Sequence, residues 1–174
     1  NNGGLLQDSI NDIGKQLIGG KIGTTDAQFF FPGNYNKPSY IVRYTGKNGA
    51  SDKVTIKASQ TQNTPNDAAH IADDGDFGVA DATGSGAYSF TLNHKAAYVT
   101  FMPYTAQGVI AGAKLQKIRI YTDNSSDQLA GTFDLADNGT LSNGTTTSNS
   151  VELNVSNFSI PSVSTYATNG ATMV

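Results

Sequence analysis

Apolar and polar side chains alternate over most of the chain. Tyr40, Val42 and Tyr44 show this pattern in one segment, and Val54 and Ile56 show it in the next. Successive side chains of a strand point to opposite faces, so the period indicates strands with one buried and one wet face, as in antiparallel sheets. Segments with this period are 39–45, 53–59, 88–92, 97–101, 118–120, 129–135 and 151–155. About seven short strands predict an all-β, antiparallel β-sandwich with Greek-key connections.

The first segment has a different period. Leu6, Ile10, Ile13 and Leu17 recur at helical spacing, and two glycines follow them. This spacing predicts a short amphipathic helix at about residues 5–18, with an irregular lead-in as the alternative. We therefore divide the chain into a lead-in of residues 1–24 and a β-sandwich domain of residues 25–174.

The connections between the predicted strands are rich in glycine, asparagine and aspartate, which tolerate the positive φ angles of tight turns. Residues 137–150 are almost wholly polar and predict a long exposed hairpin loop. Residues 171–174 have the composition of a strand at its beginning. We expect the domain to be continued by a second one in a longer protein.

The charge distribution argues against several partners. Only 14% of the residues are charged, the net charge is −3, and the chain has two arginines. A nucleic-acid partner is not expected, because phosphate binding requires a concentration of positive charge. No apolar run reaches membrane-spanning length. Cysteine is absent, which excludes disulfides, thiolate metal sites and a cysteine nucleophile.

The sequence does not offer a catalytic set, so we predict that the chain is not an enzyme. His70 and His94 are the two histidines, and a G-x-S-x-G nucleophile motif does not occur. We interpret His94 as a structural histidine that closes a turn by hydrogen bonds. We interpret His70 as a solvated loop residue. No cofactor is predicted.

An acidic cluster is the candidate for a metal site. Asp73, Asp74 and Asp76 supply the oxygen ligands that Ca²⁺ prefers. Their spacing does not match an EF-hand, since no glutamate closes the loop. Clusters of aspartate and glycine also form ordinary turns, and the turn is the favoured interpretation.

A glycan site would need exposed aromatic side chains with polar neighbours. Phe29, Phe31 and Tyr35 are the candidates, because three consecutive phenylalanines cannot all point inward from one strand. The alternative is a core-edge strand with one phenylalanine partly covered by the N-terminal segment, and we favour it. Glu152 is the single glutamate, and its place between Val151 and Leu153 predicts an outward side chain.

Part of the chain resembles the fimbrillin-like surface proteins of Bacteroidetes. The order of three motifs carries the resemblance: L-x-H-K-A-A-Y from Leu92, K-I-x-I from Lys117 and L-A-G-T-F from Leu129. The segments that take part are 60–63, 67–71, 75–78, 88–98, 115–118 and 129–134. They cover a little under half of the chain.

The resemblance implies an extracellular module at the bacterial cell surface, attached to the outer membrane or part of a fimbrium. Such proteins have two transthyretin-like sandwich domains, and this chain resembles the first. A lipid anchor is expected upstream of this sequence. The expected role is structural or adhesive, with other fimbrial subunits, joined by strand insertion, or surface ligands as partners. The alternative function is a glycan-binding module of a polysaccharide-capture system.

Overall fold

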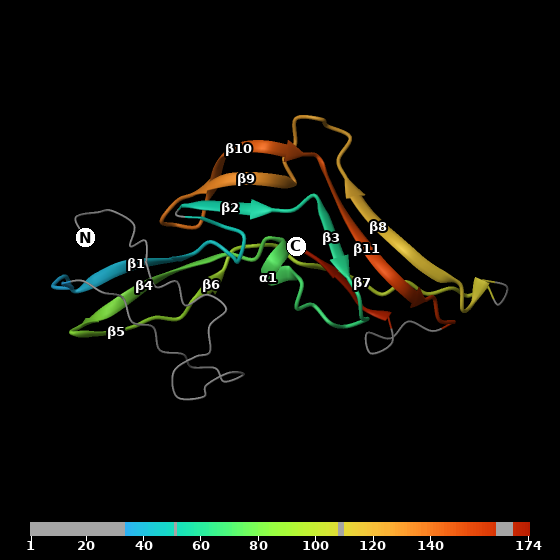
Figure 1. Ribbon diagram of the computed structural model, residues 1–174, viewed down its shortest axis with the longest axis horizontal. Coiled ribbons are helices and arrows are strands. Elements are labelled where there is room, and N and C mark those ends of the chain that lie inside the picture. Colours follow the sequence, from blue (N-terminus) through green and yellow to red (C-terminus); the bar gives the residue numbers. More distant parts are fainter. Residues whose placement is uncertain (1–33, 51, 108–109, 163–168) are drawn as a thin grey trace.

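The chain folds as an all-β sandwich, as the alternation predicted. The computed structural model describes residues 34–50, 52–107, 110–162 and 169–174, which form twelve strands and one short helix (Figure 1). The predicted helix at 5–18, the whole 1–24 lead-in, and Phe29 and Phe31 lie outside the described residues. Several strands are only two to four residues long, so the described part has more and shorter strands than the alternation predicted.

One layer of the sandwich contains two three-stranded sheets. The first has the order β10-β9-β2, and the second has the order β3-β11-β8. The bounds are β2 Lys53–Ile56, β3 Ser59–Gln62, β8 Lys114–Tyr121, β9 Ala130–Leu135, β10 Leu141–Ser148 and β11 Ser150–Ser159. The chain passes from one sheet to the other between β2 and β3. Pairing is antiparallel except for β3, which lies parallel to β11.

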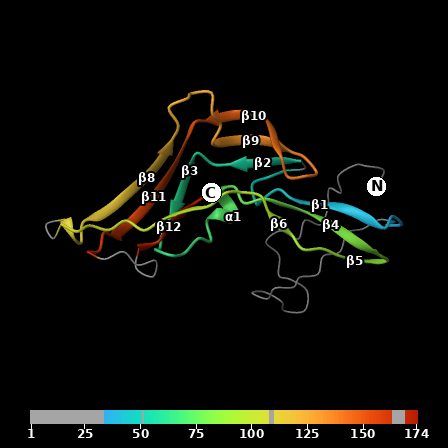
Figure 2. The ribbon, with the colours of Figure 1, turned by 180° about the vertical axis from the view of Figure 1, so that it is seen from behind.

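The other layer lies beneath these sheets in Figures 1 and 2. Its larger sheet has the order β1-β4-β5, with β6 also paired to β4, and its smaller sheet pairs β12 with β7. The helical turn α1, Ile71–Asp74, lies near the middle of the molecule (Figure 1). The strand bounds are β1 Ser39–Tyr44, β4 Gly78–Ser85, β5 Ala87–Ser89, β6 Asn93–His94, β7 Val99–Phe101 and β12 Ala171–Met173.

Two apolar clusters fill the space between the layers. Val54, Phe77, Val79 and Leu135 form the first, where β2 and β9 cover β4. The second packs the inner face of β11 against β12, and its buried members are Ala130, Val151, Leu153, Val155, Phe158, Ala171 and Met173. Ile56 packs against both clusters and joins them.

The prediction of a hairpin loop at 137–150 is wrong for most of that segment. Residues 141–148 form β10, which pairs with β9 through two register shifts. Asn143 and Thr146 have positive φ angles of 49° and 51° within this irregular pairing. Most β10 side chains are exposed, so the strand is held mainly by backbone pairing, with side-chain bonds from Asn143 to Asp134 and from Thr145 to the Thr132 carbonyl. This leaves no apolar period in the sequence.

Candidate functional site

The three aspartates of the predicted calcium cluster contact three different basic side chains. The carboxylate of Asp73 lies 2.7 Å from the Lys47 ammonium, and that of Asp74 lies 2.9 Å from the Lys57 ammonium. The carboxylate of Asp76 instead contacts His94. Within the described residues, no group of three or more acidic or histidine side chains is arranged to hold a metal ion. The cluster therefore acts as a set of separate ion pairs that fix α1 to its neighbours.

Asp76, His94 and Tyr98 form a small hydrogen-bonded cluster. The Asp76 carboxylate lies 2.7 Å from His94 Nδ1, and the same oxygen accepts a hydrogen bond from the Tyr98 hydroxyl. Burial and the hydrogen bond to Asp76 raise the pKa of the Tyr98 phenol above its ordinary value of 10.0. The three groups satisfy one another, so His94 serves the structural role that the sequence predicted. It ties β6 and the start of β7 to the end of α1.

The most unusual site surrounds β12. Ala171 is 0% exposed and Met173 is 2% exposed, so the strand lies inside the core between β7 and β3. One edge of β12 pairs with β7 in the ordinary antiparallel manner. Two side chains of β3, Gln60 and Gln62, satisfy main-chain groups of the same segment. Both glutamines are only 1% exposed.

Each glutamine side-chain amide forms hydrogen bonds with the main chain of residues 170–174, as the backbone of a neighbouring strand would. Gln60 Oε1 accepts from the Val174 N–H at 3.1 Å, and its Nε2 donates to the Val174 carbonyl at 2.6 Å. Gln62 Oε1 accepts from the Thr172 N–H at 2.8 Å, and its Nε2 donates to the Gly170 carbonyl at 3.0 Å. An amide side chain carries the same donor and acceptor as a peptide group. We call this pair of residues the glutamine clamp.

Other side chains hold the same segment. His70 Nε2 lies 2.9 Å from the Thr172 carbonyl oxygen, and Asn66 Oδ1 accepts from the Gly170 N–H at 3.0 Å. The Thr172 hydroxyl lies 3.0 Å from that of Thr100 on β7. The interpretation of His70 as a solvated loop residue is therefore wrong, because its ring is packed on β12. Its Nδ1 is buried and has no hydrogen-bond partner among the residues that the structure describes. No apolar period in the sequence marks this polar site.

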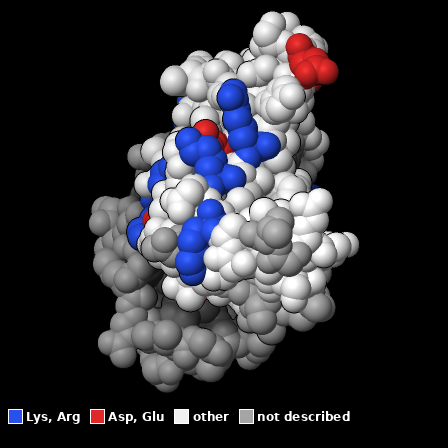
Figure 3. Space-filling view, turned by 90° about the vertical axis from the view of Figure 1, so that its right-hand side faces the viewer, with Lys and Arg blue, Asp and Glu red and all other residues white. Residues whose placement is uncertain are grey.

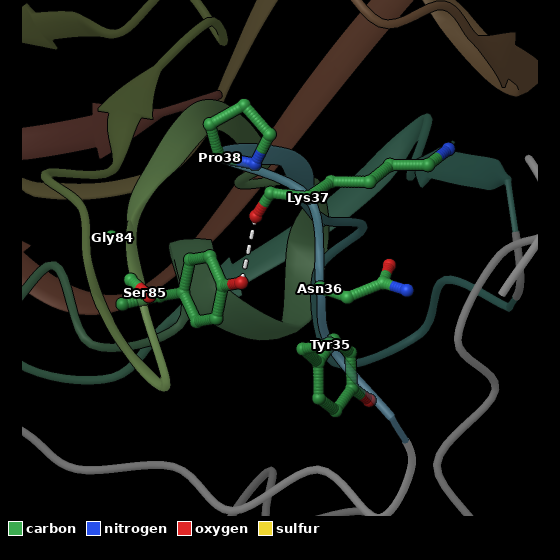
Figure 4. Close-up of a pocket in the computed structure, with 7 residues that line it drawn as sticks. Tyr35, Asn36, Lys37, Pro38, Gly84 and Ser85 are labelled. Carbon is green, nitrogen blue, oxygen red and sulfur yellow. Dashed lines mark hydrogen bonds between the residues drawn. The ribbon is translucent and has the colours of Figure 1, made fainter.

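A separate cavity of about 230 Å³ lies at the sheet that contains β1, β4 and β5. Tyr35, Lys37 and Pro38 precede β1 and form one side, and Gly84 and Ser85 end β4 on the other (Figure 4). Tyr35 is the one predicted aromatic that the structure describes, and it does line this cavity. The alternation predicts Tyr40 and Tyr88 on buried strand faces, which holds only in part, since both are half-buried and contact each other and Tyr35 edge to face at this site.

The tyrosine rings are fixed by main-chain contacts. The Tyr88 hydroxyl donates to the Lys37 carbonyl at 2.7 Å, drawn as the dashed line in Figure 4. The Tyr40 hydroxyl accepts from the N–H groups of Asn36 and Lys37 at 2.9 and 3.1 Å. The cavity therefore combines rigid aromatic walls with polar atoms, which is the chemistry of a small-ligand site.

Comparison of the chain with models of protein families, with curated proteins and with solved structures finds no match. Among the described residues, no helix is both long enough and apolar enough to span a bilayer.

Proposed function

We propose that this chain is a non-catalytic structural or adhesive module of a bacterial cell-surface assembly, a fimbria or a surface lipoprotein, and that it joins other subunits by strand insertion. The glutamine clamp is the observation that carries the proposal. It recognises a strand through main-chain atoms, in a slot that the core otherwise leaves open. The ordered motifs between Gln60 and Phe133 support the surface location.

The slot around β12 has little selectivity for the sequence of the strand that occupies it. Gln60 and Gln62 contact only peptide groups, which every residue except proline offers in full. Side-chain selection is confined to the buried positions, where Ala171 and Met173 pack on the core. Main-chain hydrogen bonds supply affinity and alternate side chains supply specificity in strand addition. A slot of this kind accepts an extended segment from the same chain or from a neighbouring subunit.

The proposal is tested by supplying the strand in trans. A chain ending at Ser162 is refolded with and without a synthetic peptide of residues 163–174, and folded protein is measured by circular dichroism and size exclusion. We expect the peptide to restore the native fold or to raise the melting temperature of the shortened chain. A control peptide with Thr172→Pro lacks the N–H that donates to Gln62 and introduces a ring beside it, so it should not bind.

Two results would contradict strand insertion. One is a shortened chain that is as stable as the full chain and indifferent to the peptide. The other is equal stabilisation by the proline peptide, since the clamp then plays no part in recognition. The surface location is tested separately, by antibody labelling of intact cells that produce the whole protein.

A glycan-binding module is the second candidate, and the tyrosine-lined cavity favours it. Its volume of about 230 Å³ is below the roughly 300–1,000 Å³ of ordinary small-molecule sites. It therefore suits a single sugar ring at the end of a glycan. Titration of the protein with monosaccharides, followed by NMR, should shift the resonances of Tyr35 and Tyr88. A glycan array without a binder, together with unchanged spectra, would refute this candidate.

A further inference from the structure

The outer face of β8 carries a concentration of positive charge. Lys114, Lys117 and Arg119 lie within this strand of eight residues, which has no acidic side chain. They make up three of the eleven cationic residues in a chain whose net charge is −3. Figure 3 shows Lys and Arg side chains gathered on the side of the molecule formed by β8 and β11, with few acidic groups among them.

Each cation on β8 contacts a polar side chain of β11, which shows that they share one face of the sheet. Lys114 Nζ donates to the Ser159 hydroxyl at 2.7 Å, and an Arg119 Nη donates to the Ser150 hydroxyl at 3.1 Å. The Lys117 ammonium lies 2.8 Å from Glu152, the single carboxylate among the described residues that contacts the group. Three cations and one carboxylate leave about two positive charges on this face.

An exposed ring lies at one end of this charged strip. Tyr121 is 64% exposed, and the Arg119 guanidinium carbon lies 5.9 Å from the ring centre. The ring therefore contacts a cation and keeps most of its surface open to solvent. The hydroxyls of Ser150 and Ser159 and the amide of Asn154 add neutral donors and acceptors on β11. We call the set of Lys114, Lys117, Arg119 and Tyr121 the β8 strip.

We propose that the β8 strip binds an anionic polysaccharide, a linear polymer of sugar acids. The carboxylates of the polymer contact the cations, its hydroxyls contact the serine and asparagine side chains, and one sugar ring packs on the open side of Tyr121. A nucleic acid fits less well, because two net charges and one ring are few for a phosphate backbone. The inference depends on neither the strand slot nor the tyrosine-lined cavity.

The test uses the full chain and polygalacturonate as the probe, with uncharged dextran as the reference polymer. Binding is measured by isothermal titration calorimetry between 50 and 200 mM NaCl. We expect polygalacturonate to bind and dextran not to bind. With two to three charges neutralised, affinity should fall on the order of tenfold over this range of salt, in line with the release of counterions from other polyanions.

Matched variants distinguish binding at the β8 strip from an effect of the net charge of the whole protein. Lys117→Gln with Arg119→Gln should reduce the salt dependence by about two units of log–log slope and largely abolish binding. Lys37→Gln with Lys47→Gln makes the same change in net charge on the segments that flank β1, in a different sheet from β8, and should leave binding unchanged. Tyr121→Ala should weaken binding roughly fivefold without changing the salt slope, as expected for one ring contact.

Three outcomes would overturn the proposal. Equal affinity for single-stranded poly-dT would show that the β8 strip binds any polyanion without selectivity. An equal loss in both charge variants would show that only net charge matters. No binding, combined with aggregation of the variant altered at Lys117 and Arg119, would show that the cations only protect a sheet edge from pairing.

Discussion

Replacing Gln62 by leucine tests whether the glutamine clamp holds β12. The side chain is 1% exposed, and its amide makes three hydrogen bonds to main-chain groups. Leucine has a similar size but can make none of them. The Thr172 N–H and the Gly170 carbonyl are then left inside the core without these partners, whereas the Thr64 carbonyl belongs to an exposed residue that water can reach.

The expected cost follows from the two buried groups. Each buried main-chain group left without a partner costs about 1–3 kcal/mol, and the apolar leucine offsets part of this. We expect Gln62→Leu to lower the free energy of unfolding by about 2–4 kcal/mol, a large share of the roughly 5–15 kcal/mol of an ordinary domain. Urea denaturation followed by tyrosine fluorescence and circular dichroism measures the change.

Gln62→Glu sharpens the test because it depends on pH. Burial disfavours a charged carboxylate, so the folded-state pKa of the new glutamate lies above its unfolded value of about 4.3. Relative to the native chain at the same pH, the variant is therefore most stable below about pH 4.3, where the protonated acid can still donate to Gly170. That stability is lost as the pH rises through the folded-state pKa.

The control for the clamp is Gln116→Leu, which makes the same change at an exposed position of β8 and should shift stability by less than about 0.5 kcal/mol. If Gln62→Leu also stays within that range, the clamp does not hold β12. A Gln62→Glu variant whose deficit is the same at pH 3.5 and pH 7 would likewise refute the hydrogen-bond account.

Two further predictions concern other parts of the fold. Tyr98→Phe removes a phenolic hydroxyl whose pKa is raised, first by burial and then by Asp76. The protonated phenol stabilises the fold fully below about pH 10 and loses its contribution as the pH rises further. In urea titrations, the free energy of unfolding of the variant should therefore be about 1 kcal/mol lower at pH 7, and it should fall less than that of the native chain between about pH 9 and 11. Gly75→Ala should destabilise the fold by about 2–4 kcal/mol, because Gly75 has a φ of +148° and a Cβ there would lie 2.9 Å from Ile56 Cα. Gly86→Ala is the control, since Gly86 has a φ of +78° but lies in open space, and it should cost only about 1–2 kcal/mol. Thermal unfolding compares the two variants.

Strands with an apolar face could be predicted from the sequence, and their sheet partners could not. The alternation at 39–45 matches β1, and that at 129–135 covers β9. The alternation at 53–59 was predicted as one strand, yet the chain changes sheets within it, so that β2 pairs with β9 and β3 pairs with β11. The change depends on contacts with distant residues, such as the bond from the Lys57 N–H to the Asp74 carbonyl, and no local pattern encodes it.

The polar elements were missed for a related reason. The strand at 141–148 has few buried side chains, so its sequence carries no hydrophobic period. The cations of β8 are spaced K-x-x-K-x-R, but the alternation predicted a strand only at 118–120, and counting charge over the whole chain did not reveal their concentration. A strand-by-strand count of charge would have found them.

The glutamine clamp shows how a functional element can have the composition of a loop. Gln60 and Gln62 lie two residues apart, so both point to the same face of β3, and that face is the buried one. The core side of this strand is therefore polar, which a hydrophobic pattern reports as solvent-exposed. This polar face is stable because β12 fills the slot and hydrogen-bonds the two amides, and within the described part of the chain no other strand pairs with β12 on that edge. The polarity of β3 and the burial of β12 thus depend on each other, and this mutual dependence is why we expect removal of residues 169–174 to leave a slot that still recognises a strand.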